Sequence, residues 1–330
     1  MAFDLAFGNW SVNRQNVNKE HWKEGSLVSG CELTTKTSSI RRGDDRRRFN
    51  GANSAFPLTC GKAYSAAANF VPKLTTTVVK YLDPQPTDRI LDIGCGDGIL
   101  TAQIASALSS GEILGLDASP GMIAGAKRMF SSPDRSNCSF HVHDCTAFDE
   151  DAAAKYLTGR WDKVFSNAAL HWILCKPDTR MDVIGAIYKA LKPGGSFVFE
   201  LGGFGNVGEV HTALIAALVV DGIDPAAARA RSPWFFPDEG WMSRALAQAG
   251  FNVEKIEMEY RPTELTPKDA QGKGGLEGWL RLMGANFLAA VWNEERIIKL
   301  ISKLLQKTIT KEDGTQWIGY VRLRGIARKP

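Results

Sequence analysis

The chain has 330 residues, and its 44% hydrophobic and 23% charged residues are ordinary usage for a soluble globular protein. No stretch approaches the roughly 20 consecutive apolar residues that a membrane-spanning helix requires. Residues 1–71 contain ten Lys and Arg against six Asp and Glu, so the net charge of +4 lies there and the remaining chain is neutral. The neutral charge of the main part of the chain predicts no nucleic-acid partner, and the lack of an apolar span predicts no membrane partner.

The first 63 residues are interpreted as an N-terminal extension. Its segment 24–61 combines a Thr/Ser run with clustered arginines and has no apolar periodicity, which predicts an inserted or disordered segment. Residues 1–8 lack the basic region and apolar core of a secretory signal, so we expect a cytoplasmic protein. The main domain is expected over 64–330.

The main domain is expected to begin with a helix. Tyr64 and Phe70, in its first part, are predicted to lie across the mouth of a cofactor site. Leu74, Val78 and Leu82 follow at helical spacing, which predicts that the helix then enters the core.

A glycine-rich run after an apolar strand at 89–93 is the most informative motif. Gly94 and Gly96 permit a tight turn and a close approach of the backbone to a ligand, and the next helix offers its N-terminal N–H groups. A dinucleotide-binding loop would have its third glycine at the position of Ile99. The loop therefore predicts a nucleotide-type cofactor other than a dinucleotide.

Polar side chains end three further expected strands, which cover 112–116, 139–143 and 161–165. Asp117 follows the first of them, where an acid can bind both hydroxyls of a ribose. In an open α/β sheet the ligand lies outside the carboxyl ends of the strands. We therefore expect Asp92, Asp117, Asp144 and Asn167 to converge at one edge of the sheet.

Residues 190–195 indicate a helix stop and a turn into a fifth strand at 196–200. The remaining expected elements are a first helical cap segment over about 203–245, a strand over 251–260, a second cap segment over about 262–312 and a last strand over 316–327. The cap segments are interpreted as insertions over the substrate, and packing on the sheet edge is the alternative.

In this order the motifs resemble those of the class I S-adenosylmethionine (SAM)-dependent methyltransferases. The resemblance covers about 72–200, and segments 165–172 (FSNAALHW) and 191–195 (LKPGG) look most like the trans-aconitate methyltransferase-like branch, which acts on small molecules. The resemblance implies SAM as cofactor. It also implies an α/β fold, with a doubly wound, seven-stranded Rossmann-like sheet and helical cap insertions.

The resemblance further implies how the cofactor is held. Asp92, Gly94 and Gly96 would surround the methionine moiety, and Asp117 would bind the ribose. Further residues expected at the cofactor are Asp144 near the adenine amino group, Asn167 beside the methionine end, and Tyr64, Cys95, Ala118 and Cys145 as neighbours. The two cysteines are interpreted as small packing side chains and not as nucleophiles.

On the acceptor side we expect His171, Trp172, Trp234 and Trp279. His171 is the first candidate for a catalytic general base and His211 the second, although a carboxylate acceptor would need no base. The related branch often has glutamine at the position of His171, which favours substrate positioning over proton transfer. Tryptophans suit an apolar or ring-bearing substrate.

The acceptor stays open between a carboxylate and a larger secondary metabolite, methylated on O or N. A tricarboxylate would require arginines in the site. The available ones are Arg229, Arg231, Arg244, Arg281 and Arg322. No metal is expected, because His141 and His143 lack further ligands at metal spacing, and the six cysteines show no CxxC pair and are expected to be reduced.

Two other functions remain as alternatives. A SAM-binding regulatory protein without turnover would fill its acceptor pocket with side chains. A dinucleotide-dependent oxidoreductase is disfavoured by Ile99 and by the absence of a Tyr-x-x-x-Lys pair near the fourth strand.

Overall fold

The computed structural model describes residues 76–130, 136–267 and 274–330. The chain divides into two compact units, Met1–Gly51 and Ala52–Pro330, and every described residue belongs to the second. The expectations for the segment 24–61, for Tyr64 and for Phe70 lie outside the described residues.

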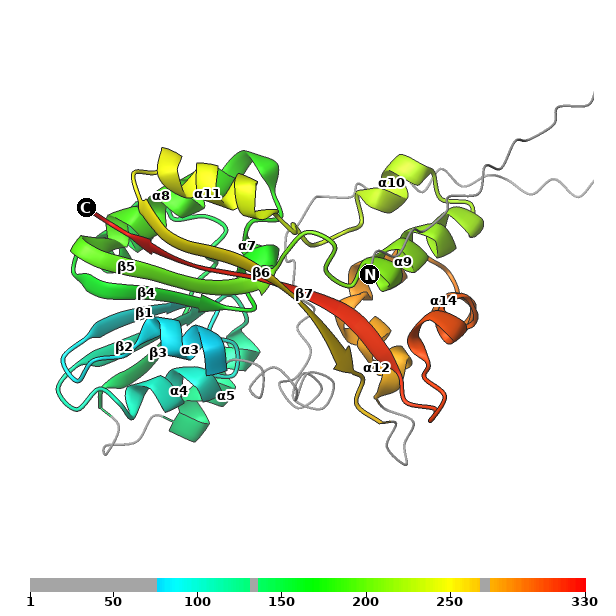
Figure 1. Ribbon diagram of the computed structural model, residues 1–330, viewed down its shortest axis with the longest axis horizontal. Helices are drawn as coiled ribbons and strands as arrows, with labels where there is room; N and C mark the ends of the chain where they lie inside the picture. Colours follow the sequence, from blue (N-terminus) through cyan, green and yellow to red (C-terminus); the bar gives the residue numbers. More distant parts are fainter. Residues whose placement is uncertain (1–75, 131–135, 268–273) are drawn as a thin grey trace, which may run out of the picture. The chain divides into compact units, whose positions relative to one another are not determined.

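A seven-stranded sheet of order β3-β2-β1-β4-β5-β7-β6 forms the centre of this unit (Figure 1). The strands are β1 (Arg89–Ile93), β2 (Glu112–Asp117), β3 (Cys138–Val142), β4 (Trp161–Asn167), β5 (Leu191–Gly202), β6 (Asn252–Glu264) and β7 (Trp317–Arg328). The first five are parallel, and β7 runs antiparallel between β5 and β6. The predicted seven-stranded α/β architecture is confirmed.

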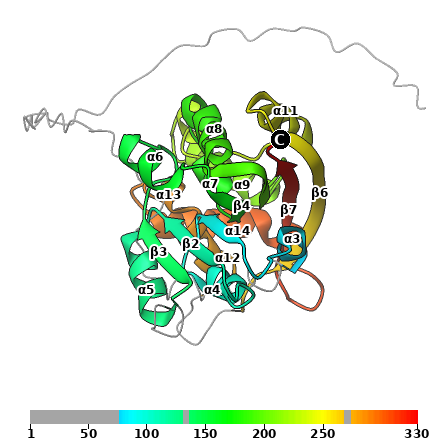
Figure 2. The ribbon, with the colours of Figure 1, turned by 90° about the vertical axis from the view of Figure 1, so that its left-hand side faces the viewer.

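Helices cover both faces of the sheet (Figures 1 and 2). One face carries α3 (Thr76–Leu82), α4 (Ile99–Ala105) and α5 (Pro120–Phe130), and the other carries α6 (Glu150–Tyr156), α7 (Leu170–Ile173), α8 (Arg180–Ala190) and α11 (Glu239–Gln248). Side chains alternate along β5, so Phe197 and Phe199 join the core under α8, whereas Val198 joins the core under α3. Residues 200 and 202 therefore face the α3 side.

A third hydrophobic cluster lies around the far part of β7. Its helices are α9 (Gly208–Val220), α10 (Pro225–Arg229), α12 (Gly275–Met283), α13 (Ala285–Leu288) and α14 (Glu294–Ile309). They pack with Ile318 and Tyr320 of β7. We call this group the helical cluster. Among the described residues, no helix has the length and apolar character needed to cross a bilayer.

The structure corrects the predicted extent of the first cap segment, about 203–245. Met242, Ala245 and Leu246 of α11 are buried in the core against the sheet, and not in the helical cluster. Their helical spacing gives α11 one apolar face, which fits the surface beside α8 and β6. The helical cluster therefore takes only α9 and α10 from this segment.

The turn expected at 190–195 is also different in detail. The preceding helix ends at Ala190, as predicted, but Leu191 already pairs with β4 and regular pairing resumes at Ser196. The residues between them form an irregularity within β5, where Gly194 has φ 77°. A short 3-10 helix at Pro177–Thr179 precedes α8.

Candidate functional site

The glycine-rich loop joins β1 to α4, and its glycines have different tasks. Gly94 and Gly96 have φ values of 76° and 57°. A Cβ on Gly94 would lie 2.2 Å from the Cβ of Ala169, so Gly94 is required by packing against the start of α7. Among the described residues, a Cβ on Gly96 would meet nothing within 4 Å. Gly96 is therefore the glycine that borders open space.

Asp117, at the end of β2, connects this strand to the glycine-rich loop by a hydrogen bond. One carboxylate oxygen accepts a hydrogen bond from the backbone N–H of Gly96 at 3.0 Å, and the other accepts one from Ser119 at 2.9 Å. Burial raises the pKa of Asp117, while these two hydrogen bonds lower it. A carboxylate offers about four acceptor positions, so capacity for further hydroxyl donors remains. Ala118 follows it and is exposed.

Asp92, in β1, has a more apolar environment. Its side chain is 3% exposed and accepts a hydrogen bond from the hydroxyl of Thr101 in α4 at 2.6 Å. Burial raises its pKa to about 7; the Thr101 hydrogen bond opposes this shift, and the charge of Asp117 adds to it. Asp92 is therefore near half ionisation at neutral pH, and a bound cation would favour its charged form.

The strand-end carboxylates lie around Cys145. Burial raises the pKa of this thiol well above its usual value, and the charges of Asp117, Asp144 and Asp92 raise it further. Burial likewise raises the pKa of Cys95, whose sulfur would lie 2.8 Å from a Cβ on Gly115. A raised pKa disfavours the reactive thiolate, which fits the prediction that both cysteines are packing residues. Asp144 itself is exposed and accepts a hydrogen bond from Thr146 N–H at 2.9 Å.

Asn167 ends β4 beside a strained backbone position. Its Oδ1 atom is enclosed and accepts no hydrogen bond from any described residue. The next residue, Ala168, has φ 56°, which is uncommon for a residue other than glycine. Strain of this kind and an unsatisfied polar atom occur often at functional sites. The enclosed Nε2 atom of His143, next to Asp144, is also without a partner, and sequence reasoning had not singled it out for a site.

His171 does not have the environment of a general base. Its Nδ1 accepts a hydrogen bond from the backbone N–H of Gly202 at 3.3 Å, which assigns the proton of the neutral ring to Nε2. Burial lowers its pKa to about 3, and the positive charge of Arg322 acts in the same direction. The predicted role of His171 as a base is therefore at odds with the structure, whereas a role as a neutral hydrogen-bond donor fits it.

The aromatic residues expected at the acceptor form one continuous series of ring contacts. Trp172 lies 5.7 Å from His171 and 5.6 Å from Trp234, and Trp234 lies 6.2 Å from Trp279, between ring centroids. Trp279 is only 3% exposed and donates its indole N–H to the hydroxyl of Tyr320 at 2.8 Å. Trp279 is thus part of the helical cluster core, and Trp172 is the more accessible of the three tryptophans.

His211, on α9, belongs to the same aromatic group. Its ring centroid is 5.4 Å from that of Trp234 and 5.9 Å from that of Phe287, and its enclosed Nε2 has no hydrogen-bond partner among the described residues. Burial lowers its pKa, so it too is neutral at physiological pH.

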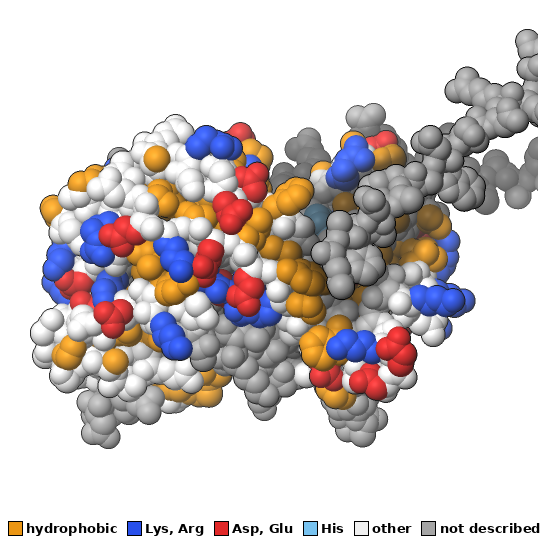
Figure 3. Space-filling model, in the orientation of Figure 1, with side chains coloured by type: hydrophobic (Ala, Val, Ile, Leu, Met, Phe, Trp, Pro, Cys, Tyr) orange, Lys and Arg blue, Asp and Glu red, His pale blue; other side chains and the backbone are white. Residues whose placement is uncertain are grey.

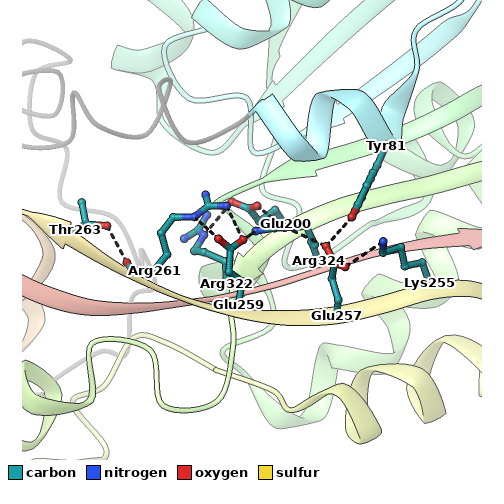
Figure 4. Close-up of polar contacts among 9 residues, drawn as sticks. All are labelled: Tyr81, Glu200, Lys255, Glu257, Glu259, Arg261, Thr263, Arg322 and Arg324. Atoms are coloured by element: carbon teal, nitrogen blue, oxygen red, sulfur yellow. Dashed lines mark hydrogen bonds and ion pairs between the residues drawn. The ribbon is translucent and has the colours of Figure 1, made fainter.

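A network of ion pairs crosses β5, β7 and β6 on the α3 side, and Figure 4 shows its members. Glu200 is fully buried and accepts hydrogen bonds from the Nε atoms of Arg322 and Arg324, both at 2.9 Å. Arg324 also pairs with Glu257 and Glu259. Sequence reasoning named Arg322 but missed Glu200 and Arg324. Alternating charges along strands, such as Arg322 and Arg324, were the available signal.

Comparisons with known proteins give a consistent result. Residues 90–195 match the family described as a methyltransferase domain. An uncharacterised methyltransferase of Schizosaccharomyces pombe is 35% identical over 269 residues, covering 81% of this chain and 96% of that protein. A trans-aconitate 2-methyltransferase of Deinococcus radiodurans is 29% identical over 152 residues, covering 39% and 52% respectively.

A relative with a different substrate also matches. The 18S rRNA (guanine(1575)-N(7))-methyltransferase of Saccharomyces cerevisiae is 33% identical over 137 residues, covering 39% of this chain and 45% of that protein. Among solved structures, a protein of Bacillus halodurans described as a methyltransferase superposes with a TM-score of 0.53 at 14% identity, covering 78% of this chain and 99% of that one. At this identity the likeness concerns the fold alone.

Proposed function

Because this chain belongs to the class I SAM-dependent methyltransferases, we propose that it transfers the methyl group to a carboxylate oxygen of a small-molecule acceptor. The cofactor is SAM, which when bound supplies a methyl group on a sulfonium. The proposal concerns the acceptor and the roles of individual residues, and it includes the expected cytoplasmic location.

The residues at the strand ends fit this cofactor. Asp117 retains acceptor capacity for two ribose hydroxyls, and Gly96 leaves room for a ligand beside the loop. The enclosed Oδ1 of Asn167 has no donor in the described part of the chain, and the cofactor's ammonium group would provide one. Asp92 would become fully ionised beside a bound cation.

The environment of His171 is the observation that carries the proposed acceptor. With a pKa of about 3 and with Nδ1 occupied by Gly202 N–H, His171 is a very weak base. Burial lowers the pKa of His211 as well, which makes it a weaker base, and its ring lies within the aromatic group. A carboxylate is already ionised and nucleophilic at neutral pH, so it needs no base. Holding it in line with the methyl group supplies most of the catalysis.

An RNA acceptor is the second candidate, because one relative is described as an rRNA methyltransferase. The face in Figure 3 bears acidic and basic side chains interleaved among the described residues. On β6, Lys255 pairs with Glu257 and Arg261 with Glu259. A phosphate-binding face would instead gather basic side chains. This surface supports the small-molecule acceptor.

A screen with methyl-labelled SAM tests the acceptor. Purified protein is incubated with pools of carboxylic acids, phenols, amines and total RNA, and labelled products are separated. We expect label in a methyl ester, which releases labelled methanol under mild base. Label in RNA or in an amine would contradict the proposed acceptor, and SAM binding without any labelled product would favour the regulatory alternative.

Replacing Asp117 tests the proposed ribose contact. We expect Asp117→Ala to weaken SAM binding at least tenfold, or by about 1.4 kcal/mol, in calorimetric titrations. The matched control is Asp224→Ala, which also removes a carboxylate that accepts from two backbone N–H groups, at the start of α10. An unchanged dissociation constant for Asp117→Ala would refute the ribose role, and equal weakening in both variants would indicate a general loss of folding.

A further inference from the structure

Arg322 differs from the other arginines that the sequence offered for an anionic substrate. Its side chain is 9% exposed, whereas Arg229, Arg231, Arg244 and Arg281 are all exposed. Arg281 is also engaged by Glu277 and Glu295 on the surface of the helical cluster. From its position and its partners we infer that Arg322 binds the carboxylate of the methyl acceptor and selects for it. This inference rests on the proposed function.

The strand register places Arg322 beside the methyl-transfer site. Arg322 lies opposite Gly202 of β5, and the backbone N–H of Gly202 donates to His171. Two residues earlier in β5, Glu200 pairs with Asn167, the last residue of β4. The side chain of Arg322 reaches back to Glu200, so its guanidinium lies close to the carboxyl ends of β4 and β5. These strand ends are where ligands bind in sheets of this kind.

The hydrogen bonds of Arg322 leave its terminal nitrogens available. Its Nε donates to Glu200, and within the described part of the chain neither Nη atom has a partner. Arg324 shares Glu200 but is saturated, because its Nη1 and Nη2 also pair with Glu257 and Glu259. Figure 4 shows both arginines on the same face of β7. A guanidinium carries five N–H donors in a plane that matches a carboxylate, so the free edge of Arg322 suits this group.

Arg322 shares its counter-ion with a second arginine. Among the described residues its ion-pair partner is Glu200, which Arg324 also contacts. A nearly buried cation that shares its counter-ion gains from a second anion.

The surroundings of Arg322 favour a carboxylate on an apolar body. A Cβ on Gly202, the neighbour of Arg322 across the strands, would lie 2.7 Å from the ring of Phe236. Phe236 lies 5.8 Å from His171 and 5.8 Å from Trp234, between ring centroids. Aromatic rings therefore lie beside Gly202, the strand neighbour of Arg322, and such rings exclude water and bury apolar surface of a ligand.

The transfer explains how this arrangement separates substrate from product. One carboxylate oxygen forms the O–CH₃ bond while the C–S bond breaks, and the electron pair of that bond remains on sulfur. No proton moves, and the other oxygen stays on Arg322. Because the ester product is neutral, its ion pair with Arg322 is lost, and the product is bound more weakly than the substrate.

Titrations of Arg322 variants test the inference. Benzoate and trans-cinnamate are titrated by calorimetry into protein saturated with S-adenosylhomocysteine, beside their uncharged counterparts benzamide and cinnamamide. We expect the wild-type protein to prefer each carboxylate over its amide by about tenfold or more, and Arg322→Gln to abolish that preference. Arg322→Lys keeps the positive charge but not the planar fork of N–H donors, so this variant should retain part of the carboxylate preference. Arg281→Gln is the surface control and should behave as wild type.

The titrations also keep the inference falsifiable. A wild-type protein without carboxylate preference, or an Arg322→Gln variant that retains it, would overturn the inference. Arg322→Gln could fail to fold because Glu200 loses a partner. In that case the double variant Glu200→Gln with Arg322→Gln is titrated in its place, because two glutamines can form a neutral hydrogen-bonded pair. SAM affinity should stay unchanged throughout.

The outcome also separates this inference from the proposed function. Methyl transfer to a carboxylate with an unchanged KM in Arg322→Gln would retain the function and reject the role of Arg322. Alternatively, methyl transfer could go to another group while binding of the carboxylate probes still depends on Arg322. That result would reject the proposed function but show that Arg322 forms an anion-binding site.

Discussion

Asp92 and Asp117 are neighbouring strand-end carboxylates, and burial raises the pKa of both against different sets of hydrogen bonds. Asp117 accepts two backbone hydrogen bonds, which favour its charged form, whereas Asp92 is buried and accepts only the hydroxyl of Thr101. Burial therefore dominates at Asp92 and raises its pKa to about 7. Without a ligand, the protein contains a poorly solvated carboxylate, and a bound cation would stabilise the charged form of Asp92.

This environment predicts that Asp92→Asn stabilises the protein without SAM at alkaline pH. The folded-state pKa of about 7 lies above the ordinary value of 3.8, so ionising Asp92 costs folding free energy as pH rises from about 4 to 7. At pH 8 the variant should be more stable by up to about 4 kcal/mol, and the gain should disappear towards pH 4. Urea unfolding at both pH values measures it, and SAM binding should be weaker in the variant.

The opposite pattern would count against this account. If Asp92→Asn destabilises the apo-protein equally at both pH values, the carboxylate contributes through its hydrogen bond with Thr101 and not through its charge. Thr101→Val removes that hydrogen bond alone and serves as the comparison.

At the scale of elements, the connection between β1 and α4 shows why glycines in one motif are not equivalent. Gly94 touches Ala169 at the start of α7, so it joins the loop to the segment that follows β4. Gly96 borders open space and donates its N–H to Asp117. The first is required for packing of the loop, and the second is available for a ligand.

We expect Gly94→Ala and Gly96→Ala to separate these two requirements. Gly94→Ala should destabilise the protein by about 3 kcal/mol or more, from the contact with Ala169 together with the positive φ. Gly96→Ala should cost about 1–2 kcal/mol, from the backbone alone, yet weaken SAM binding more than its stability loss explains. Adding Ala169→Gly should restore part of the stability lost in Gly94→Ala, but none of that lost in Gly96→Ala. Thermal unfolding and calorimetry provide both readouts, and a rescue of Gly96→Ala would contradict this assignment.

At the scale of the whole described unit, β6 and β7 connect the sheet to the helical cluster, and the ion-pair network lies along them. Hydrogen bonds from Arg261 and Arg324 lower the pKa of Glu259, against the effect of burial. At Glu257 burial acts to raise the pKa, but hydrogen bonds from Tyr81 and Lys255 lower it overall. Both acids therefore stabilise the folded state only while they are ionised.

This network predicts a loss of stability in acid. Because the folded-state pKa values lie below the ordinary 4.5, the contribution of Glu257 and Glu259 is complete above pH 4.5 and is lost as pH falls through the lowered values. Replacing both by Gln should flatten the fall of the melting temperature below pH 4.5. The side chains are 33% and 44% exposed, so the effect should be modest and smaller in high salt. If the melting temperature of the variant with both substitutions falls as steeply in acid as that of the wild type, the acid-sensitive groups lie elsewhere in the protein.

Much of the fold was readable from local signals in the sequence. Apolar runs that end in Asp117, Asp144 and Asn167 identified three of the strands. These residues were expected close together because a parallel sheet brings the carboxyl ends of its strands to one edge. Helical spacing in 276–283 and 294–306 identified α12 and α14. These signals span a few residues each, so they do not depend on distant partners.

By itself the sequence determined the class of sheet, the cofactor loop and the identity of the strand-end carboxylates. Only the tertiary structure decided the state of His171, the packing of α11 on the sheet and the burial of Trp279. Arg322 and Glu200 are separated by 122 residues, and no local pattern pairs them. The physical reason is that burial and ionisation depend on what surrounds a side chain, and those surroundings come from strands and helices that only folding brings together.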